Sequence, residues 1–533
     1  MKYQIKPNWG AIFVGLIFFC ATAQGQYQSL SGLPQLEALT TNVNGTGITV
    51  GQPEAPDGDS TVWEVDPTNV PVSAGLFTYI YSNGISSTMF TNSLGVDSGH
   101  ADLVAQNFYG PAFGVATNVA HVDNYDADNF VEENDQGDIY FPYINTNDRV
   151  VNQSWIFTDV TSNDEVVIDE AFDNCAAKYG ILFVSGAGNS TSTPISPPAT
   201  CYNGIGVGVY NGGSSPGPTI DFGRCKPDIT ASASNGVSSF STPQVAGAAA
   251  VLIQAGLRGD GGSDTNSASN LKTVKALLLN GAVKPADWTN IAPSPLDYTY
   301  GAGYLNVFNS YEQLAAGKHG YNFSTNIPTG TVHPPVATAA SVPVLNGWDY
   351  NTNTSSATRD AVNHYFFNMT NSVRGSAFTL TATLVWNKHY NATSINNLEL
   401  FLYNAANTNL VAASTSAVDN VQQVFVPQLA QGRYDLQVWK AGGAGIVSDS
   451  EPYALAWDMF SDFLSVKQYG TNVCLTWPAY PAGFEVETAP SLNPPVTWSA
   501  NNVPTPVYTN NLNVIWMTPG NSEEYFRLQT PNF

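Results

Sequence analysis

A histidine and a serine in the first half of the chain have surroundings that suit nucleophilic catalysis. His100 follows a loop and opens a helical pattern, and Ser239 lies in a loop that leads into a long apolar helix. A serine hydroxyl becomes an effective nucleophile only when a neighbouring base takes its proton, and an imidazole titrates near neutral pH. The dipole at the start of a helix also favours a developing oxyanion. We therefore predict that Ser239 is a nucleophile and that His100 is its general base.

Between these two residues, an asparagine follows an apolar run and a glycine turn. Residues 181–187 form the apolar run, Gly188 lets the backbone turn sharply, and Asn189 comes next. Open α/β folds place their sites at the carboxyl ends of strands, where such a turn lies. Asn189 could there donate an amide hydrogen to an oxyanion. The alternative is a turn asparagine with a purely local role.

The elements around these residues indicate an α/β domain. Short apolar runs alternate with helical patterns at 48–50, 100–109, 117–123, 149–156, 164–178, 181–187 and 203–210, and further helices are expected at 239–257 and 270–279. This alternation is typical of a parallel sheet that is covered by helices on both faces.

The chain changes character near residue 320. Beyond a Pro- and Thr-rich stretch, residues 378–386, 398–403 and 434–439 alternate with period two, which predicts an antiparallel β-sandwich. We expect five parts: a signal peptide at 1–23, an N-terminal segment at 24–45, a catalytic domain at 46–320, a β-sandwich at 321–460 and a small β module at 461–533. Because every proposed catalytic group precedes residue 250, we also expect residues 24–320 to fold without the β domains.

The N-terminal segment indicates the localisation of the protein, and the net charge excludes some classes of partner. Lys2 and Lys6 precede an apolar run, and Ala21 to Ala23 supply a small-residue cleavage site, so we expect a secreted or periplasmic protein with no membrane span. The formal net charge is −24, with only 18 Lys plus Arg, which argues against nucleic acid or an anionic membrane surface as partner. In an oxidising compartment, disulfides are expected among Cys175, Cys201, Cys225 and Cys474.

The order and surroundings of the candidate residues resemble the subtilisin-like serine proteases, or subtilases. The matching motifs are His100-Ala-Asp-Leu-Val-Ala105, Gly186-Ala-Gly-Asn189 and Val237-Ser-Ser-Phe-Ser-Thr-Pro-Gln-Val-Ala-Gly247. The likeness covers about half of the chain. It implies a subtilisin-like doubly wound sheet and a secreted serine endopeptidase, in which Asn189 and the backbone N–H of Ser239 stabilise the oxyanion. The later β segments resemble sandwich and fibronectin-type modules that are appended to secreted bacterial-type proteases.

The resemblance also suggests the third member of the triad. In the family an aspartate ends the first core strand, and Gly47 to Ala55 is the one suitable strand pattern upstream of His100, with Glu54 in register. A glutamate can orient a histidine as an aspartate does. Asp57 and Asp59 remain alternatives.

Substrate contacts follow from the same resemblance. Ser154, Trp155, Ile156 and Gly186 would contact the substrate. Trp155 and Ile156 stand where the family often has Leu and Gly, so their bulk would narrow the primary pocket. The substrates would be proteins or peptides.

Departures from the family pattern leave other functions open. Val237 and Ser238 stand where the family has Gly-Thr, and Gln244 stands where it has His. If Val237 replaces a glycine that needs positive φ, the backbone must differ. The alternatives are a catalytically impaired, subtilase-fold binding or surface protein and an esterase, which the chain order acid, His, Ser disfavours.

The chemistry requires no cofactor. The acidic stretch from Asp123 to Asp138 could hold a structural calcium ion, as the family often does, and the alternative is a solvated loop. The C-terminal modules would contact a surface or polymer.

Overall fold

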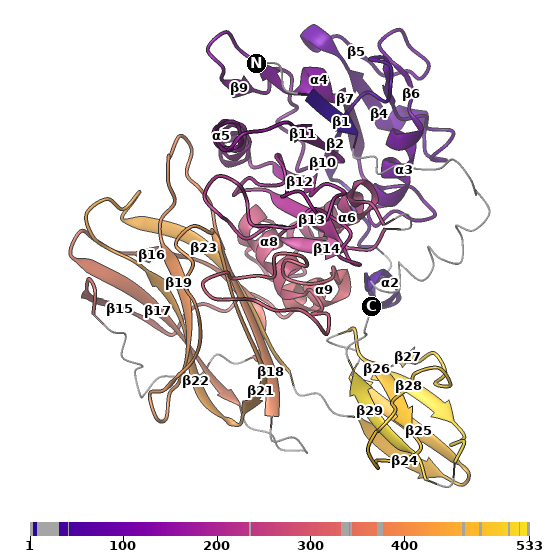
Figure 1. The fold of residues 1–533 in the computed structure, drawn as a ribbon, viewed down its shortest axis with the longest axis vertical. Helices are drawn as coiled ribbons and strands as arrows, with labels where there is room; N and C mark the ends of the chain where they lie inside the picture. The colour runs from indigo at the N-terminus through magenta and orange to yellow at the C-terminus, as the bar shows by residue number, and fades with distance from the viewer. Residues whose placement is uncertain are drawn as a thin grey trace.

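The computed structural model describes residues 4–7, 31–40, 42–233, 236–331, 341, 344–369, 377–460, 464–478, 482–509, 512–521 and 523–529. Most of the predicted signal peptide lies outside these residues. Figure 1 shows an α/β domain, a β-sandwich and a small β module, in chain order. The fold class predicted from the sequence is confirmed.

An eight-stranded sheet forms the centre of the α/β domain. Its strands, in spatial order, are β14 (Ile229–Ala231), β13 (Ile205–Val209), β12 (Leu182–Gly186), β10 (Val150–Gln153), β2 (Thr49–Glu54), β7 (His121–Asp126), β4 (Phe77–Ile80) and β5 (Ser86–Ser87). Neighbouring strands pair in parallel except β5, which runs antiparallel to β4. The strands β4 and β5, at one end of the sheet, are short and were not predicted from the sequence.

Helices cover both faces of this sheet. They are α2 (Leu33–Leu39), α3 (Gly99–Phe108), α4 (Ala127–Phe130), α5 (Ser162–Tyr179), α6 (Ser238–Arg258), α7 (Thr265–Ala268), α8 (Leu271–Asn280) and α9 (Val307–Ala315). Three of the predicted helices, α3, α6 and α8, begin and end within one residue of the expected bounds. Small two-stranded pairs join β3 (Val62–Glu64) to β6 (Val96–Asp97) and β8 (Glu132–Glu133) to β9 (Ile139–Tyr140).

Alternate residues of β12 pack into two different cores. Leu182 and Val184 belong to the core that contains α3 and α6, whereas Phe183 packs against Phe172 of α5 on the other face. A strand that is buried on both faces is apolar at every position. This explains why the apolar run at residues 181–187 is continuous in the sequence.

The sandwich consists of two antiparallel sheets. One contains β15 (Phe323–Pro328), β17 (Arg359–Met369), β22 (Gly432–Lys440), β19 (Leu398–Asn404) and β20 (Leu410–Ser414); the other contains β16 (Asn346–Thr354), β23 (Ser450–Phe460), β18 (Ala377–Trp386) and β21 (Val421–Ala430). Inward-facing residues such as Leu384, Leu400 and Leu436 fill the core between the sheets. The predicted antiparallel sandwich is confirmed.

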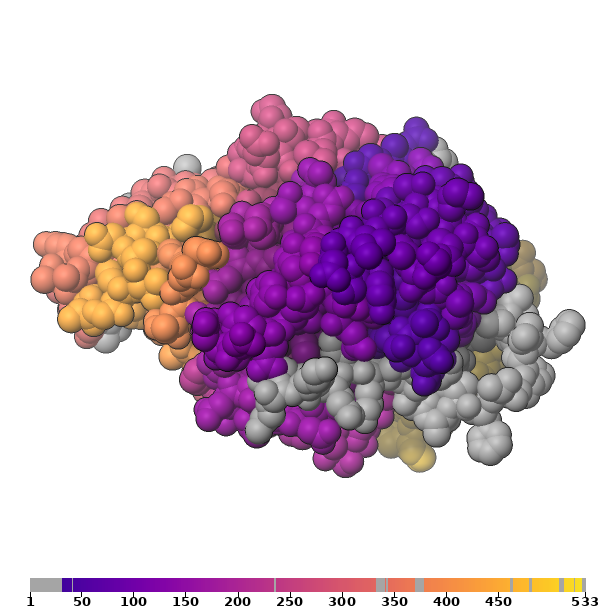
Figure 2. Space-filling view, turned by 90° about the horizontal axis from the view of Figure 1, so that it is seen from above, coloured from indigo at the N-terminus to yellow at the C-terminus, as the bar shows by residue number. Residues whose placement is uncertain are grey.

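The sandwich shares a core with the α/β domain. Helix α8 packs against β18 and β23, and Trp348, Val385 and Ala456 belong to the same hydrophobic cluster as the helices of the α/β domain. Asn280 at the end of α8 accepts hydrogen bonds from Thr381 (3.1 Å) and other hydroxyls of β18. The two parts lie side by side in both views (Figures 1 and 2). This arrangement argues against independent folding of residues 24–320.

The C-terminal module has two small sheets. One contains β24 (Ser465–Tyr469), β25 (Asn472–Pro478), β28 (Leu512–Met517) and β27 (Val507–Thr509), and the other pairs β26 (Glu485–Ala489) with β29 (Tyr525–Gln529). Its core is built around Trp477 and Leu475.

The structure corrects the expectation of disulfides. Cys175, Cys201, Cys225 and Cys474 are all buried and unbonded to one another. Burial raises the pKa of the Cys175 thiol to about 12, so this thiol stays protonated. Among the described helices, none has the length and apolar character needed to span a bilayer.

Candidate active site

The imidazole of His100 and the carboxylate of Glu54 meet at the carboxyl end of the sheet. His100 lies in the first turn of α3 and Glu54 is the last residue of β2. His100 Nδ1 lies 2.9 Å from Glu54 Oε2, although 46 residues separate them in the chain. Both side chains are buried, so this hydrogen bond lies in a low-dielectric environment. The pair has the geometry that a catalytic histidine and its orienting acid require.

The other carboxylate oxygen of Glu54 is also held in place. Gln52, two residues earlier on the same face of β2, donates from Nε2 to Glu54 Oε1 at 2.8 Å and to the carbonyl of Ala101 at 3.0 Å. Tyr109 donates its hydroxyl to Gln52 Oε1 at 2.6 Å. Gln52 therefore fixes both the acid and the start of the histidine helix. Sequence reasoning missed this residue, although its spacing of two from Glu54 was a usable signal.

The alternative acids lie elsewhere. Asp57 and Asp59 are exposed in the loop after β2, and the Asp59 carboxylate accepts hydrogen bonds from the backbone and hydroxyl of Thr61. Hydrogen bonding to Thr61 lowers the pKa of Asp59, as expected for a solvated turn aspartate. The geometry favours Glu54 over both aspartates as the partner of His100.

Ser239 lies in the first turn of α6, and the residue after it packs near His100. The ring of the next residue, Phe240, lies 5.9 Å from the His100 ring, centroid to centroid. Pro243 has no N–H and cannot donate to the carbonyl of Ser239 in the helical pattern; Ser154 Oγ donates to that carbonyl instead, at 2.8 Å. The backbone of Ser239 is thereby joined to the residue between β10 and β11 (Trp155–Thr158).

The nucleophile loop accommodates its departure from the family pattern without strain. Val237 has φ −118° and ψ 142°, which is ordinary extended backbone. The positive φ in this loop, +67°, falls on the preceding Gly236. Val237 therefore does not need the left-handed conformation that a branched side chain would resist.

Asn189 reaches the first turn of α6 from the end of β12. Its Oδ1 accepts hydrogen bonds from the backbone N–H of Ser238 at 2.7 Å and from the Ser238 hydroxyl at 3.0 Å. Gly188 has φ +101°, and a Cβ there would come within 2.7 Å of Ser215 Oγ, so glycine is required at this turn. With Oδ1 directed at the helix, the amide nitrogen is directed away from Ser238.

The predicted substrate residues divide into two groups. Ile156 lies beside the Asn189 turn, with its Cδ1 3.9 Å from the Cβ position of Gly188. Gly186 is buried at the end of β12, where it pairs with Val207. Trp155 is also fully buried; its Nε1 donates to the carbonyl of Pro53 at 3.0 Å and its ring packs on Phe157. Its bulk therefore fills the core and does not narrow a substrate pocket.

A peptide strand already pairs with β11 in the structure. Strand β1 (Gln4–Pro7) runs antiparallel to β11, with Gln4 opposite Thr158 and Pro7 opposite Trp155. This strand and β11 lie close together in Figure 1. The pairing shows that this edge accepts an extended backbone through main-chain hydrogen bonds.

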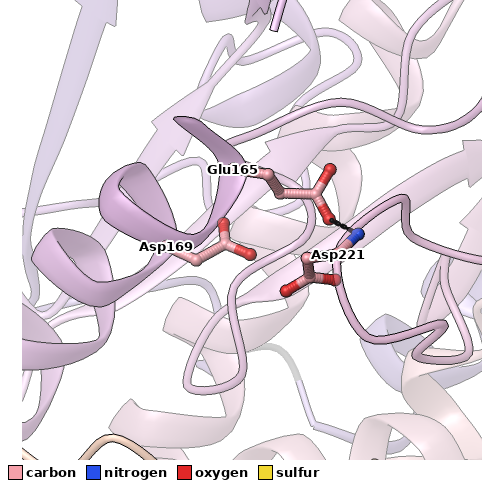
Figure 3. A group of neighbouring side chains, drawn as sticks. All are labelled: Glu165, Asp169 and Asp221. Atoms are coloured by element: carbon pink, nitrogen blue, oxygen red, sulfur yellow. Dashed lines mark hydrogen bonds between the residues drawn. The ribbon is translucent and has the colours of Figure 1, made fainter. Parts of the chain in front are cut away.

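Three carboxylates elsewhere in the domain come close enough to hold a cation. Glu165 and Asp169 on α5 face Asp221, whose backbone N–H donates to Glu165 at 3.3 Å (Figure 3). The guanidinium of Arg224 lies among them, 2.5 Å from Asp221, 2.6 Å from Asp169 and 3.7 Å from Glu165. An arginine thus supplies the positive charge in this group.

In the acidic stretch from Asp123 to Asp138, carboxylates accept hydrogen bonds from nearby groups of the protein. Asp126 caps α4 by accepting from the backbone of Asp128 at 3.2 Å, and Glu132 accepts the hydroxyl of Tyr140 at 2.7 Å. Burial raises the pKa of Asp126 to about 7. Calcium binding here stays a prediction.

The sandwich contains a hydroxyl–imidazole–carboxylate chain that sequence reasoning missed. Thr325 Oγ1 lies 3.0 Å from His364 Nε2, and His364 Nδ1 lies 2.9 Å from Asp435 Oδ2. These residues come from three adjacent strands, β15, β17 and β22, so only strand pairing brings them together. Phe323 stacks on the His364 ring at 4.6 Å. Because Thr325 Oγ1 contacts an imidazole, a reagent that labels reactive hydroxyl groups could also modify Thr325, and the labelled residue must be identified.

Comparisons with known proteins agree with the motifs. Residues 73–303 match the model of the subtilase family. The structure is similar to patellamide maturation protease PatA, with 19% identity over 51% of this chain and 98% of that chain and a TM-score of 0.34. It is also similar to the PatG macrocyclase in complex with peptide, with 14% identity over 55% of this chain and 97% of that chain and a TM-score of 0.37. A third similar structure is tripeptidyl peptidase 2, with 11% identity over 78% of this chain and 44% of that chain and a TM-score of 0.30. A search of curated proteins finds no match.

The matched segment contains three of the four proposed catalytic residues. His100, Asn189 and Ser239 lie inside it, whereas Glu54 lies upstream, so the role of Glu54 depends on its contact with His100. The family supports serine peptidase function. Residues 73–303 of this chain are thus similar in sequence to the subtilase family.

Proposed function

We propose that the chain is a secreted serine endopeptidase that uses Ser239 as nucleophile, His100 as general base and Glu54 as orienting acid. The contact of 2.9 Å between Glu54 and His100, beside the helix turn that carries Ser239, is the observation that carries this proposal. The signal-peptide pattern at residues 1–23 supports secretion.

The reaction proceeds in two halves. Ser239 Oγ attacks the scissile carbonyl carbon, and its proton passes to His100 Nε2, while Glu54 accepts the Nδ1 hydrogen and stabilises the imidazolium. His100 then returns the proton to the leaving amine, which leaves an acyl ester on Ser239. Water, deprotonated by the same imidazole, hydrolyses that ester. No cofactor takes part in these steps.

Two donors stabilise the tetrahedral oxyanion. We assign this role to the Asn189 side-chain amide and the backbone N–H of Ser239, at the positive end of α6. The bond from Asn189 Oδ1 to Ser238 supports the assignment, because it fixes the amide plane relative to the nucleophile. The substrate backbone would pair antiparallel with β11, as Gln4–Pro7 does. Ser154, Ile156 and Gly186 would form the adjoining wall.

Labelling with a fluorophosphonate, followed by peptide mapping, tests the nucleophile. We expect the label on Ser239 in the full-length protein, no label in Ser239→Ala, and unchanged labelling in Thr325→Val. Casein is expected to be hydrolysed much faster than a short-chain ester. A label on Thr325 alone would remove Ser239 as the nucleophile, and a preference for the ester would indicate an esterase.

The burial of the reacting groups favours one other candidate, an inactive binding protein. Ser239 is 0% exposed and His100 is 1% exposed, so a substrate must displace whatever covers them. A folded protein that neither takes the label nor hydrolyses casein after removal of residues 1–23 would support this alternative.

A further inference from the structure

A cavity lies where the α/β domain, the sandwich and the C-terminal module meet. Its volume is about 390 Å³, within the range of small-molecule sites. Phe425 and Phe460 from the sandwich and Phe484 from the C-terminal module supply apolar walls, and Lys284 from the loop after α8 supplies a primary amine. The proposed peptidase residues do not line it.

Lys284 is buried at the edge of this cavity without a counter-charge. Lys284 is only 9% exposed, and its Nζ donates a hydrogen bond to the carbonyl of Ala302. The rings of Trp288 and Phe425 lie 5.0 Å and 5.7 Å from Nζ. Within the described part of the chain, no carboxylate forms an ion pair with this amine, although Asp458 lines the same cavity and Asp287 lies in the same loop.

Two other buried lysines provide a contrast inside the same molecule. Lys226 and Lys275 both pair with Asp228, at 2.6 Å and 3.0 Å. Burial lowers the pKa of Lys275, and the carboxylate of Asp228 opposes this shift. Among the residues that the structure describes, no carboxylate pairs with Lys284 in this way, and burial lowers its pKa to about 7. A substantial fraction of Lys284 is therefore an unprotonated amine at neutral pH.

We propose that Lys284 is a second reactive centre of this protein, where the amine condenses with a small aldehyde whose apolar body lies between Phe425, Phe460 and Phe484. The inference does not depend on peptidase activity. A desolvated lysine in an apolar pocket is activated for this chemistry.

The condensation conserves atoms and electrons. The Nζ lone pair forms a bond to the carbonyl carbon, and the carbonyl π electrons move to oxygen. A proton passes from nitrogen to oxygen to give a carbinolamine, and loss of water breaks the C–O bond and leaves an imine. No oxidant or reductant is needed. The hydrogen bond from the amine to Ala302 holds Nζ at the cavity wall during the attack.

Reductive trapping tests the proposal on the full-length protein. Benzaldehyde and cyanoborohydride at pH 7 should modify Lys284 at least about tenfold faster than Lys178 or Lys467, because an ordinary lysine is almost fully protonated at this pH. Lys178 and Lys467 are exposed. The rate at Lys284 should level off near pH 8, while the rates at exposed lysines keep rising towards pH 10. Peptide mapping by mass spectrometry measures every site in one sample.

Two controls keep the outcome clear. Lys284→Met should remove the fast site alone, and because the rates are compared in the natural protein, the test does not depend on whether this variant folds. Benzoate has the same ring but no electrophilic carbonyl, so it should give little protection. Modification of Lys284 no faster than of Lys467, or strong protection by benzoate, would show that Lys284 is a charged anion-binding residue and would overturn the proposal.

Discussion

Asn189 Oδ1 accepts the backbone N–H of Ser238 at 2.7 Å, across 49 residues of sequence, and so joins the end of β12 to the first turn of the nucleophile helix. One side chain thus performs a structural task with its oxygen, while its nitrogen is the group that we assign to the oxyanion. The two tasks can be separated by substitution because they use different atoms.

Asn189→Asp keeps the oxygen acceptor and removes the donor. We expect a fall in kcat of roughly 10² to 10³-fold with little change in Tm. Asn189→Ala should lower kcat similarly and also destabilise the protein by about 1 kcal/mol, because the Ser238 N–H loses its partner. Steady-state kinetics and thermal unfolding separate the two effects. Full activity in the aspartate variant would exclude the proposed role of the amide.

Glu54→Gln tests the orienting acid. We expect the fold to persist and kcat to fall by about 10⁴-fold, because an amide can present its nitrogen to His100 and hold the wrong tautomer. Asp59→Asn is the matched control, since Asp59 is an exposed carboxylate in the adjoining loop. Circular dichroism verifies the fold of both variants. Equal activity of the Glu54 variant and the natural protein would contradict the assignment.

Truncation after residue 320 tests the shared core. The cut would expose the face of α8 that packs against β18 and β23, and would leave Asn280 without Thr381 and its neighbours. We expect residues 24–320 to aggregate and residues 24–460, which retain the sandwich, to stay soluble. Size-exclusion chromatography distinguishes these results. A soluble, active 24–320 fragment would restore the expectation from the sequence.

The carboxylate group around Arg224 should make stability depend on pH. Burial, together with the neighbouring Asp221 and Asp169, raises the pKa of Glu165 to about 9 from its ordinary 4.5. Between these pH values the folded chain holds a proton that the unfolded chain releases, so this group's contribution to the free energy of unfolding falls as the pH rises. Glu165→Gln resembles the protonated form and should therefore lose less stability between pH 6 and pH 9.

Urea unfolding at both pH values measures the difference. Glu37→Gln, at an exposed glutamate of α2, is the control and should follow the natural protein. If the Glu165 variant and the natural protein lose equal stability between pH 6 and pH 9, Glu165 does not carry the proton in the folded state.

The sequence by itself determined the central sheet, the sandwich and the frames of His100, Asn189 and Ser239. Buried strands and long apolar helices have local signatures, because burial on both faces demands apolar residues at every position. The turn at Gly188 could be predicted for a similar reason, since the positive φ that favours glycine there is a local property of the backbone. Short strands such as β4 and the edge strand β5 carry little of this pattern and were missed.

Only the tertiary structure decided which side chains meet. The choice of Glu54 over Asp57 and Asp59 depends on the direction of each side chain at the end of β2, which register alone does not fix. Likewise, the inward orientation of Trp155 and the isolation of Lys284 from Asp228 follow from packing between distant segments. The electrostatic environment of a side chain and a core shared by two domains both depend on many contacts between distant segments. Local sequence patterns therefore do not predict them.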